Sequence, residues 1–217
     1  MRALRPELGD PRTTVDDMDH LGARIATWDA EAASFDEPAD HGLSDPAIRE
    51  TWLRLMLDTL PPAPARVVDL GCGTGTLTLL LAEAGYAVDG LDFSPAMVAR
   101  ARAKLAGVEG ATVAEGDAAE PRLPLASYDV VLSRHVLWAM LDPTTALARW
   151  SALLRPRGRV VLVEGCWSSG VGLTAARTVA LAEGAGLRAE VRPLDDPAYW
   201  GRPISDERYL VVAVPAR

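Results

Sequence analysis

The stretch RVVDLGCGTGT, residues 66–76, restricts the possible folds more than any other part of the chain. It begins with a short, mostly apolar run and continues with glycines at every second position, namely Gly71, Gly73 and Gly75. The apolar residues that follow have the length and composition of a helix. A buried strand, a glycine turn and a helix start are typical of an open α/β sheet, in which a ligand can lie against bare main chain.

Strand-like and helix-like segments alternate from this stretch onward. The expected strands are 66–70, 87–91, 111–114, 129–133, 159–163, 189–192 and 208–214. The last two have no helix between them, so we expect them to run antiparallel. The sequence therefore predicts an α/β, Rossmann-like fold: a mostly parallel seven-stranded sheet with an antiparallel last pair and helices on both faces.

Two further helices are expected before the sheet, at 16–35 and from Asp45 to about residue 60. Asp45 can cap the second helix, with Pro46 at its first position. Because these helices cannot extend a parallel sheet, we expect them to cover its ligand-binding edge. The predicted organisation is a tail and helical cover over 1–64 and a ligand-binding domain over 65–217, which together form one compact unit.

Length and charge exclude several classes of protein. The 217 residues suffice for one α/β domain with a proper core, and the net charge of −8 argues against nucleic-acid binding. No apolar run is long enough for a membrane span or a secretory signal, and two cysteines make no metal-ligand spacing. We expect a cytoplasmic monomer or homodimer without a metal, a membrane partner or a nucleic-acid partner.

The pattern D-x-G-x-G-x-G, from Asp69 to Gly75, resembles the first motif of the class I S-adenosylmethionine-dependent methyltransferases. A dinucleotide fingerprint would need its third glycine at position 76, which is Thr76. The resemblance covers about residues 65–214. It implies that S-adenosyl-L-methionine is the cofactor and S-adenosyl-L-homocysteine its product. The residues that it assigns to the methionine end of the cofactor are Asp69, Gly71, Cys72 and Gly73.

Acidic residues follow the next two expected strands, where ligands of open α/β sheets bind. Asp92 can accept hydrogen bonds from both hydroxyls of a ribose, and Phe93 and Met97 offer apolar surface to an adenine ring. Asp117 and Ala118 match the family position where an acid and a backbone amide face the adenine edge.

The segment SRHVLWAM after the fourth strand differs between members of the family according to their substrate. By the resemblance, Arg134 lies beside the methionine part of the cofactor. His135 is the first candidate for a catalytic base and His41 the second, because histidine exchanges a proton near neutral pH. A purely structural role for His135 stays open.

The stretch TWDAEAASFDEPADHG, residues 27–42, resembles the lead-in of small-molecule methyltransferases of the ubiquinone/menaquinone and biotin-pathway type. That group usually has a tyrosine where this chain has Phe35. The aromatic residues expected to line the substrate pocket are Trp28, Phe35, Trp138 and Trp167.

The predicted function is in-line transfer of a methyl group from S-adenosylmethionine to an N, O, S or C atom of a small molecule. One alternative is an NAD(P)-dependent oxidoreductase, since Asp92 could also bind the ribose of NAD. The other is a partner subunit that binds S-adenosylmethionine without catalysis.

Overall fold

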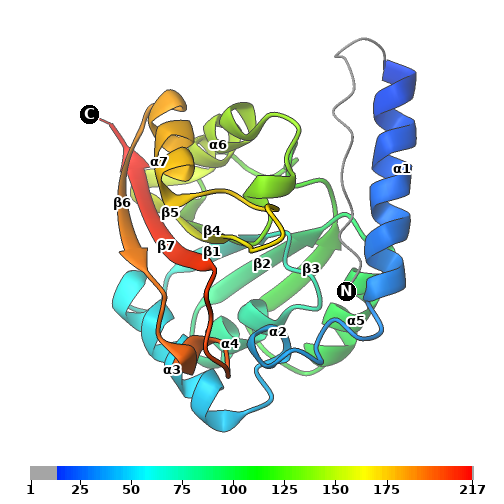
Figure 1. Ribbon diagram of the computed structural model, residues 1–217, viewed down its shortest axis with the longest axis vertical. Helices are drawn as coiled ribbons and strands as arrows, with labels where there is room; N and C mark the ends of the chain where they lie inside the picture. The colour runs from blue at the N-terminus through cyan, green and yellow to red at the C-terminus, as the bar shows by residue number, and fades with distance from the viewer. Residues whose placement is uncertain (1–13, 217) are drawn as a thin grey trace.

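The computed structural model describes residues 14–216, and its secondary structure follows the expected alternation (Figure 1). The helices are α1 (Thr14–Glu31), α2 (Ala39–Gly42), α3 (Pro46–Thr59), α4 (Thr76–Glu83), α5 (Pro95–Lys104), α6 (Pro143–Ala152), α7 (Ala175–Gly184) and the 3₁₀ turns η1 (Leu137–Ala139) and η2 (Pro197–Tyr199). The strands are β1 (Arg66–Leu70), β2 (Ala87–Asp92), β3 (Ala111–Glu115), β4 (Tyr128–Arg134), β5 (Leu154–Cys166), β6 (Leu187–Pro193) and β7 (Glu207–Pro215).

The strands form one seven-stranded sheet in the order β3-β2-β1-β4-β5-β7-β6. Strands β1 to β5 pair in parallel, and β7 runs antiparallel to both of its neighbours, β5 and β6. The predicted fold is therefore confirmed, including the antiparallel last pair. Since β7 runs against β5, the chain that enters β7 lies at the carboxyl edge of the parallel strands.

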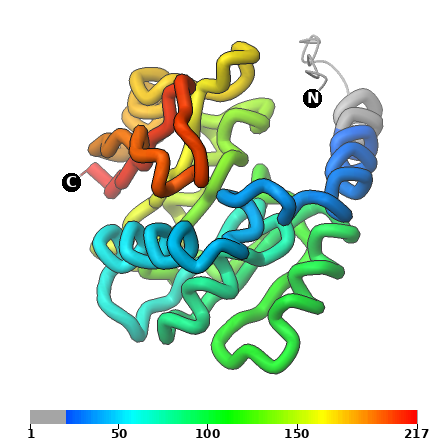
Figure 2. The backbone as a smooth tube through the Cα atoms, turned by 60° about the horizontal axis from the view of Figure 1, so that its bottom comes forward, coloured from blue at the N-terminus to red at the C-terminus, as the bar shows by residue number. Residues whose placement is uncertain are grey.

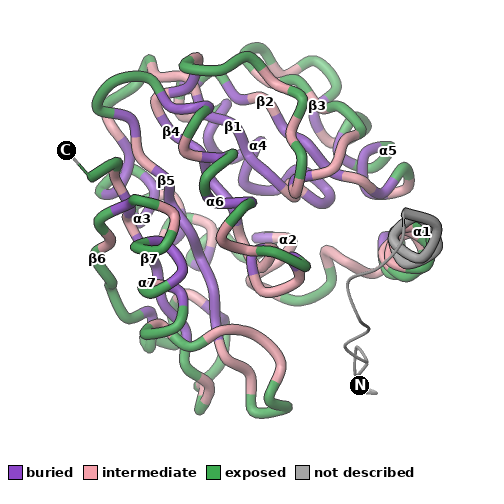
Figure 3. The backbone as a smooth tube through the Cα atoms, turned by 90° about the horizontal axis from the view of Figure 1, so that it is seen from above, coloured by how far each residue is buried: buried purple, intermediate pink, exposed green. Residues whose placement is uncertain are grey.

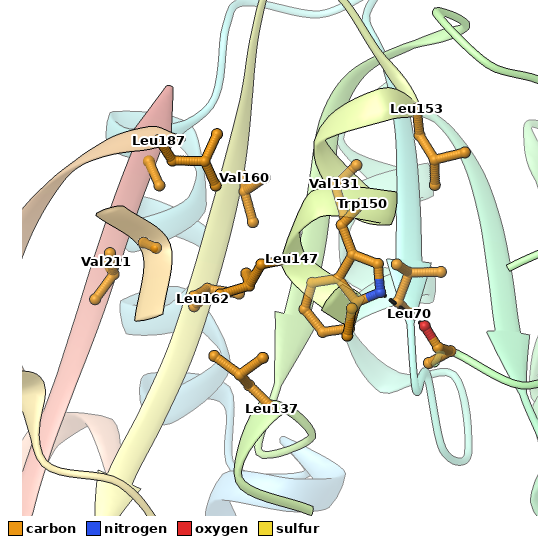
Figure 4. Packing of buried hydrophobic residues seen from close by; sticks show 14 of the residues in the cluster. Leu70, Val131, Leu137, Leu147, Trp150, Leu153, Val160, Leu162, Leu187 and Val211 are labelled. Atoms are coloured by element: carbon orange, nitrogen blue, oxygen red, sulfur yellow. Dashed lines mark hydrogen bonds between the residues drawn. The ribbon is translucent and has the colours of Figure 1, made fainter. Parts of the chain in front are cut away.

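Alternate residues of the strands supply two separate cores, one on each face of the sheet. Val67 and Val130 pack with α3 and α4, whereas Val68 and Val131 pack with α6 and α7. Figure 3 shows the central strands β1, β4 and β5 largely buried, whereas β6 at the edge of the sheet is mostly exposed. On the α6 and α7 side, Trp150 packs in one cluster with Leu147 and Leu162 (Figure 4). The strands are apolar on both faces because both faces are covered.

Strand β5 is longer than expected. It begins at Leu154 instead of near residue 159, and its register with β4 shifts between Tyr128 and Val130. The strand is irregular over residues 156–158, where Arg157 takes a φ of 71°. The short elements α2, η1 and η2 were not predicted, because helical pieces of three or four residues are too short to show a periodicity.

The two N-terminal helices lie in different places. Helix α1 sits at the side of the molecule against α5 (Figures 1 and 2), where Asp29 Oδ1 accepts hydrogen bonds from Ser94 Oγ at 2.5 Å and Ala96 N at 3.1 Å. Helix α3 is capped by Asp45 as predicted, but it packs on a face of the sheet through Trp52, Leu55 and Met56.

The expectation that both helices cover the ligand-binding edge is therefore wrong for α3, whose apolar side is wide enough to bury against the strands. The remaining part of the cover is the end of α1 and the connector that contains α2. Residues 1–13 of the predicted tail lie outside the described residues.

Candidate functional site

A cavity of about 660 Å³ opens at the carboxyl edge of the parallel strands. All sixteen residues predicted for the site line it: Trp28, Phe35, His41, Asp69, Gly71, Cys72, Gly73, Asp92, Phe93, Met97, Asp117, Ala118, Arg134, His135, Trp138 and Trp167. They come from the end of α1, the connector after it, and the ends of β1, β2, β3, β4 and β5 with the segments that follow these strands. Its size is that of a pocket for a small molecule (about 300–1,000 Å³).

A second cavity, of about 220 Å³, lies around Arg66, Asp89 and Tyr128. Its polar groups satisfy one another, since Asp89 Oδ2 accepts hydrogen bonds from Arg66 Nη2 at 2.8 Å and from Tyr128 Oη at 3.0 Å. It contains none of the predicted site residues, so the larger cavity is the candidate site.

The glycine loop after β1 bends back over the end of β2. Gly71 N and Cys72 N both donate to Leu91 O, at 2.7 and 3.0 Å. Gly71 has a φ of 73°, and a Cβ on it would lie 2.3 Å from Val136 Cγ2. Only glycine therefore allows this backbone both its conformation and its approach to the chain leaving β4.

Asp69 lies at the end of β1 and is almost completely buried. Its Oδ2 accepts a hydrogen bond from Thr78 Oγ1 at 2.7 Å. Burial raises the pKa of Asp69 to about 6, with the Thr78 hydrogen bond acting against this change. The group is therefore mostly ionised at neutral pH, and a cationic partner in the cavity would stabilise its charge further.

Asp92 at the end of β2 joins the glycine loop to the start of α5. Its Oδ2 accepts from Gly73 N at 2.8 Å and its Oδ1 from Ser94 N at 2.9 Å. Burial raises the pKa of Asp92, and both backbone hydrogen bonds oppose the rise. Because each carboxylate oxygen can accept a second hydrogen bond, Asp92 can still bind two hydroxyl groups of a ligand.

The wall beyond Asp92 combines apolar surface with one acid. Met97 is buried, and the guanidinium of Arg24 lies 5.4 Å from the centre of the Phe93 ring. Asp117 Oδ1 accepts from Ala119 N at 2.8 Å, and Ala118 O accepts from Trp150 Nε1 at 2.7 Å. These contacts fix a flat apolar slot with a carboxylate at its rim.

The connector after α1 is tied to the glycine loop by a polar cluster. Asp36 accepts a hydrogen bond from Thr74 Oγ1 at 2.5 Å and pairs with Lys104 Nζ at 2.9 Å. Next to it, Phe35 packs on Gly73 and stacks on His41 with ring centres 4.7 Å apart. The cover is thus held over the loop by an ion pair and by aromatic packing.

The chain leaving β4 carries Arg134 and His135. Arg134 Nη1 donates to Asp40 O at 2.6 Å, which links β4 to the cover. His135 has a φ of 59°, in the left-handed region, and both of its ring nitrogens are buried without a hydrogen-bond partner among the described residues. Burial and the charge of Arg134 lower the pKa of His135 well below its ordinary value, so the ring is neutral at pH 7.

Glu164 lies behind this turn and does not line the cavity. Its Oε1 accepts hydrogen bonds from Val136 N at 3.1 Å and Leu137 N at 2.8 Å, the two amides that follow His135. Burial raises the pKa of Glu164 to about 8, with both amide hydrogen bonds opposing the rise. Glu164 therefore holds the backbone that directs His135 and Trp138 toward the cavity.

Sequence reasoning missed part of the wall, which comes from the connection between β6 and β7. These residues are Trp200, Arg202 and Asp206 in the connection and Arg208 at the start of β7. The predicted antiparallel last pair was the signal that could have found them, because it places the start of the last strand at the carboxyl edge. Arg49 pairs with Glu83 and does not line the cavity.

Between residues 14 and 216, no helix is both long and apolar enough to cross a membrane. The same part of the chain has no group of three His, Cys, Asp or Glu side chains arranged to hold a metal ion.

Comparison with known proteins gives consistent matches. A family model described as a methyltransferase domain matches residues 68–162. A nocamycin O-methyltransferase of Saccharothrix syringae is 36% identical over 115 residues, which are 50% of this chain and 41% of that protein. A demethylmenaquinone methyltransferase of Thermus thermophilus is 36% identical over 118 residues, 52% of this chain and 53% of that protein. The chain thus spans about half the length of the curated relatives it matches.

Among solved structures, an S-adenosylmethionine-dependent methyltransferase from Mesorhizobium loti superposes with a TM-score of 0.62 at 26% identity, covering 76% of this chain and 97% of that one. The [4+2]-cyclase SpnF superposes with a TM-score of 0.68 at 16% identity, covering 77% of this chain and 82% of that one, which shows a shared fold alone. Residues 68–162 are thus similar to a methyltransferase domain, and the surrounding fold is similar to that of an S-adenosylmethionine-dependent methyltransferase.

Proposed function

We propose that the chain is an S-adenosylmethionine-dependent methyltransferase acting on a small molecule. The observation that supports this most is the convergence of Asp69, Asp92 and Asp117, from the ends of three neighbouring strands, on one cavity beside the glycine loop. The names of two relatives, a nocamycin O-methyltransferase and a demethylmenaquinone methyltransferase, support a small-molecule acceptor.

The donor set of the cavity fits the cofactor. Buried Asp69 suits the cationic amino group of a methionine, and Asp92 has acceptor capacity for two ribose hydroxyls. The slot between Phe93 and Met97 suits an adenine ring, with Asp117 at its rim to accept from the amino group. When bound, the cofactor supplies a methyl group on a positively charged sulfur.

The chain's own contribution is positioning and proton removal. Reacting atoms held at about 3–3.5 Å need little further help when the acceptor is a neutral amine. A hydroxyl acceptor must lose a proton, and His135 is neutral and free to receive it on a ring nitrogen. His41 is the second candidate, although its Nδ1 already lies 3.1 Å from Phe35 O. The aromatic wall of Trp138 and Trp167 excludes water.

The remaining assignments are proposals of the same kind. We infer an N-terminal segment over 1–64, in which the end of α1 and the connector with α2 form the cover, and a cofactor-binding domain over 65–217. The two form one unit because α3 shares a core with the strands. Two free thiols, Cys72 and Cys166, favour a reducing compartment such as the cytoplasm. The net charge of −8 disfavours nucleic acid as a partner. A monomer or a homodimer is expected.

Calorimetric titration with S-adenosylhomocysteine and, in parallel, with NADH tests the proposal. We expect micromolar binding of the first and none of the second. Asp92→Ala should weaken S-adenosylhomocysteine binding at least about tenfold, because hydrogen bonds to a charged group contribute about 1.5–3 kcal/mol each. The exposed Asp195→Ala is the matched control.

Binding of NADH alone would refute the proposal and restore the oxidoreductase alternative. Binding of S-adenosylhomocysteine without methyl transfer to any acceptor would favour the non-catalytic partner subunit. His135→Ala should keep cofactor affinity and lower turnover, and unchanged turnover would assign His135 to structure.

A further inference from the structure

We propose that the methyl acceptor is a flat aromatic acid, whose rings lie against the tryptophan wall and whose carboxylate binds Arg208. This inference deepens the proposed methyltransferase function and rests on it. The residues that support it lie around His135, in the β6–β7 connection and at the start of β7.

Three indole rings and one imidazole surround the acceptor end of the cavity. The ring centre of His135 lies 5.2 Å from that of Trp167 and 6.3 Å from that of Trp200, and Trp138 lies 5.9 Å from Trp167. The indole N–H groups of Trp138 and Trp200 already donate to His135 O and Leu194 O. These two rings therefore offer carbon surface, which favours a planar apolar molecule.

Arg208 places a buried positive charge within this wall. Its guanidinium carbon lies 5.3 Å from the ring centre of Trp167 and 4.7 Å from that of Trp200. Its side chain is only 5% exposed, and its Nη2 donates to Asp206 Oδ2 at 3.2 Å. Among the described residues this is its one hydrogen bond, although a guanidinium carries five N–H donors and its Nε is buried without a partner.

An unsatisfied buried guanidinium is costly, and an anion on a ligand would satisfy it. Asp206 contacts only one of the guanidinium nitrogens of Arg208, Nη2. Asp206 is itself engaged, with its Oδ1 accepting from Ser168 N at 2.6 Å. Arg208 therefore keeps N–H donors available to an anionic group of the acceptor.

The same arrangement opposes a cationic acceptor. Aromatic cages hold ammonium groups over the faces of their rings, but Arg208 already lies over Trp167 and Trp200. A second cation would meet its repulsion. A neutral aromatic acceptor would pack on the rings but would leave the guanidinium donors unsatisfied.

The test is calorimetric titration at saturating S-adenosylhomocysteine with three probes of one shape: 2-naphthoate, 2-naphthylmethanol and 2-naphthylmethylammonium. We expect the naphthoate to bind at least about tenfold more tightly than the alcohol, because it gains one charge-assisted hydrogen bond. The ammonium probe should bind more weakly than both. Failure of S-adenosylhomocysteine itself to bind would refute the proposed function. If S-adenosylhomocysteine binds normally, three results would overturn only this inference: equal affinity for the three probes, a preference for the cationic probe, or no binding of any probe.

Variants separate the charge from the aromatic wall. Asp206→Asn keeps an acceptor for Ser168 N but removes the competing carboxylate, so it should tighten naphthoate binding and leave the alcohol unchanged. Arg208→Gln should abolish the preference for naphthoate, with thermal melting as the check on folding. The exposed Arg188→Gln, on β6 outside the cavity, is the control. If both variants fold and their affinity for naphthoate equals that of the wild type, Arg208 does not bind the carboxylate of the acceptor.

Discussion

Replacing Glu164 with glutamine should change how the stability of the protein depends on pH. The carboxyl group is completely buried, its Oε1 is held by two backbone amides, and its Oε2 has no partner among the described residues. Burial raises its pKa to about 8 from the ordinary 4.5. The folded protein therefore holds this proton over a range of pH in which the unfolded chain releases it.

The sign follows from proton linkage. Between the two pKa values the folded state binds more protons, so stability falls as pH rises, by about 1.4 kcal/mol per pH unit. This contribution is fully present below about pH 4.5 and is lost once the pH has passed about 8. The total is up to about 5 kcal/mol, a large part of the roughly 5–15 kcal/mol that stabilises a domain.

Glutamine keeps the carbonyl that accepts the amides of Val136 and Leu137 but does not titrate. In urea unfolding followed by circular dichroism, the free energy of unfolding of Glu164→Gln should rise relative to the wild type across this range. Its unpartnered amide N–H adds a constant cost, which does not alter the slope. Buried Asp69, whose pKa is raised to about 6, titrates in both proteins and cancels in the difference.

The exposed Glu190→Gln, on β6, is the matched control and should parallel the wild type. A constant difference between Glu164→Gln and the wild type from about pH 5 to 8 would refute the reasoning, because it would mean that folding does not perturb the Glu164 carboxyl.

Two further predictions concern backbone geometry. Asp45→Ala should lower the free energy of unfolding by about 1 kcal/mol, since Asp45 Oδ1 accepts a hydrogen bond from Ala47 N at 2.8 Å at the start of α3. Urea unfolding measures this change, and an unchanged free energy of unfolding would exclude a capping role. Gly71→Ala should lower both stability and S-adenosylhomocysteine affinity more than Gly107→Ala, measured by thermal melting and calorimetry. Both glycines have positive φ, but only Gly71 would clash, with Val136, so equal effects would show that conformational strain alone matters.

Much of the site was predictable because the determining features are local. The glycines at alternate positions specify the turn after β1, and the acids Asp92 and Asp117 follow recognisable strands. Once the strands are parallel, their carboxyl ends must meet at one edge, so side chains twenty or more residues apart converge on one cavity. The same logic located His135 and Trp167, at the ends of β4 and β5.

Other features could not be read from the sequence, because they depend on contacts between distant segments. Helix α3 has the same amphipathic character as a covering helix, and only the free strand face beside it decides where it packs. The left-handed backbone of His135 likewise depends on Glu164, which reaches the amides of Val136 and Leu137 from a neighbouring strand.

By itself the sequence determined the order of strands and helices, the glycine turn and the acids that follow β1, β2 and β3, since these arise from residue types at short spacing. Only the tertiary structure decided the acceptor wall, in which Arg208 lies between Trp167 and Trp200. The physical reason is that charge, burial and hydrogen bonding in a cavity are sums over groups brought together by folding, whereas turns and strand patterns belong to a few consecutive residues.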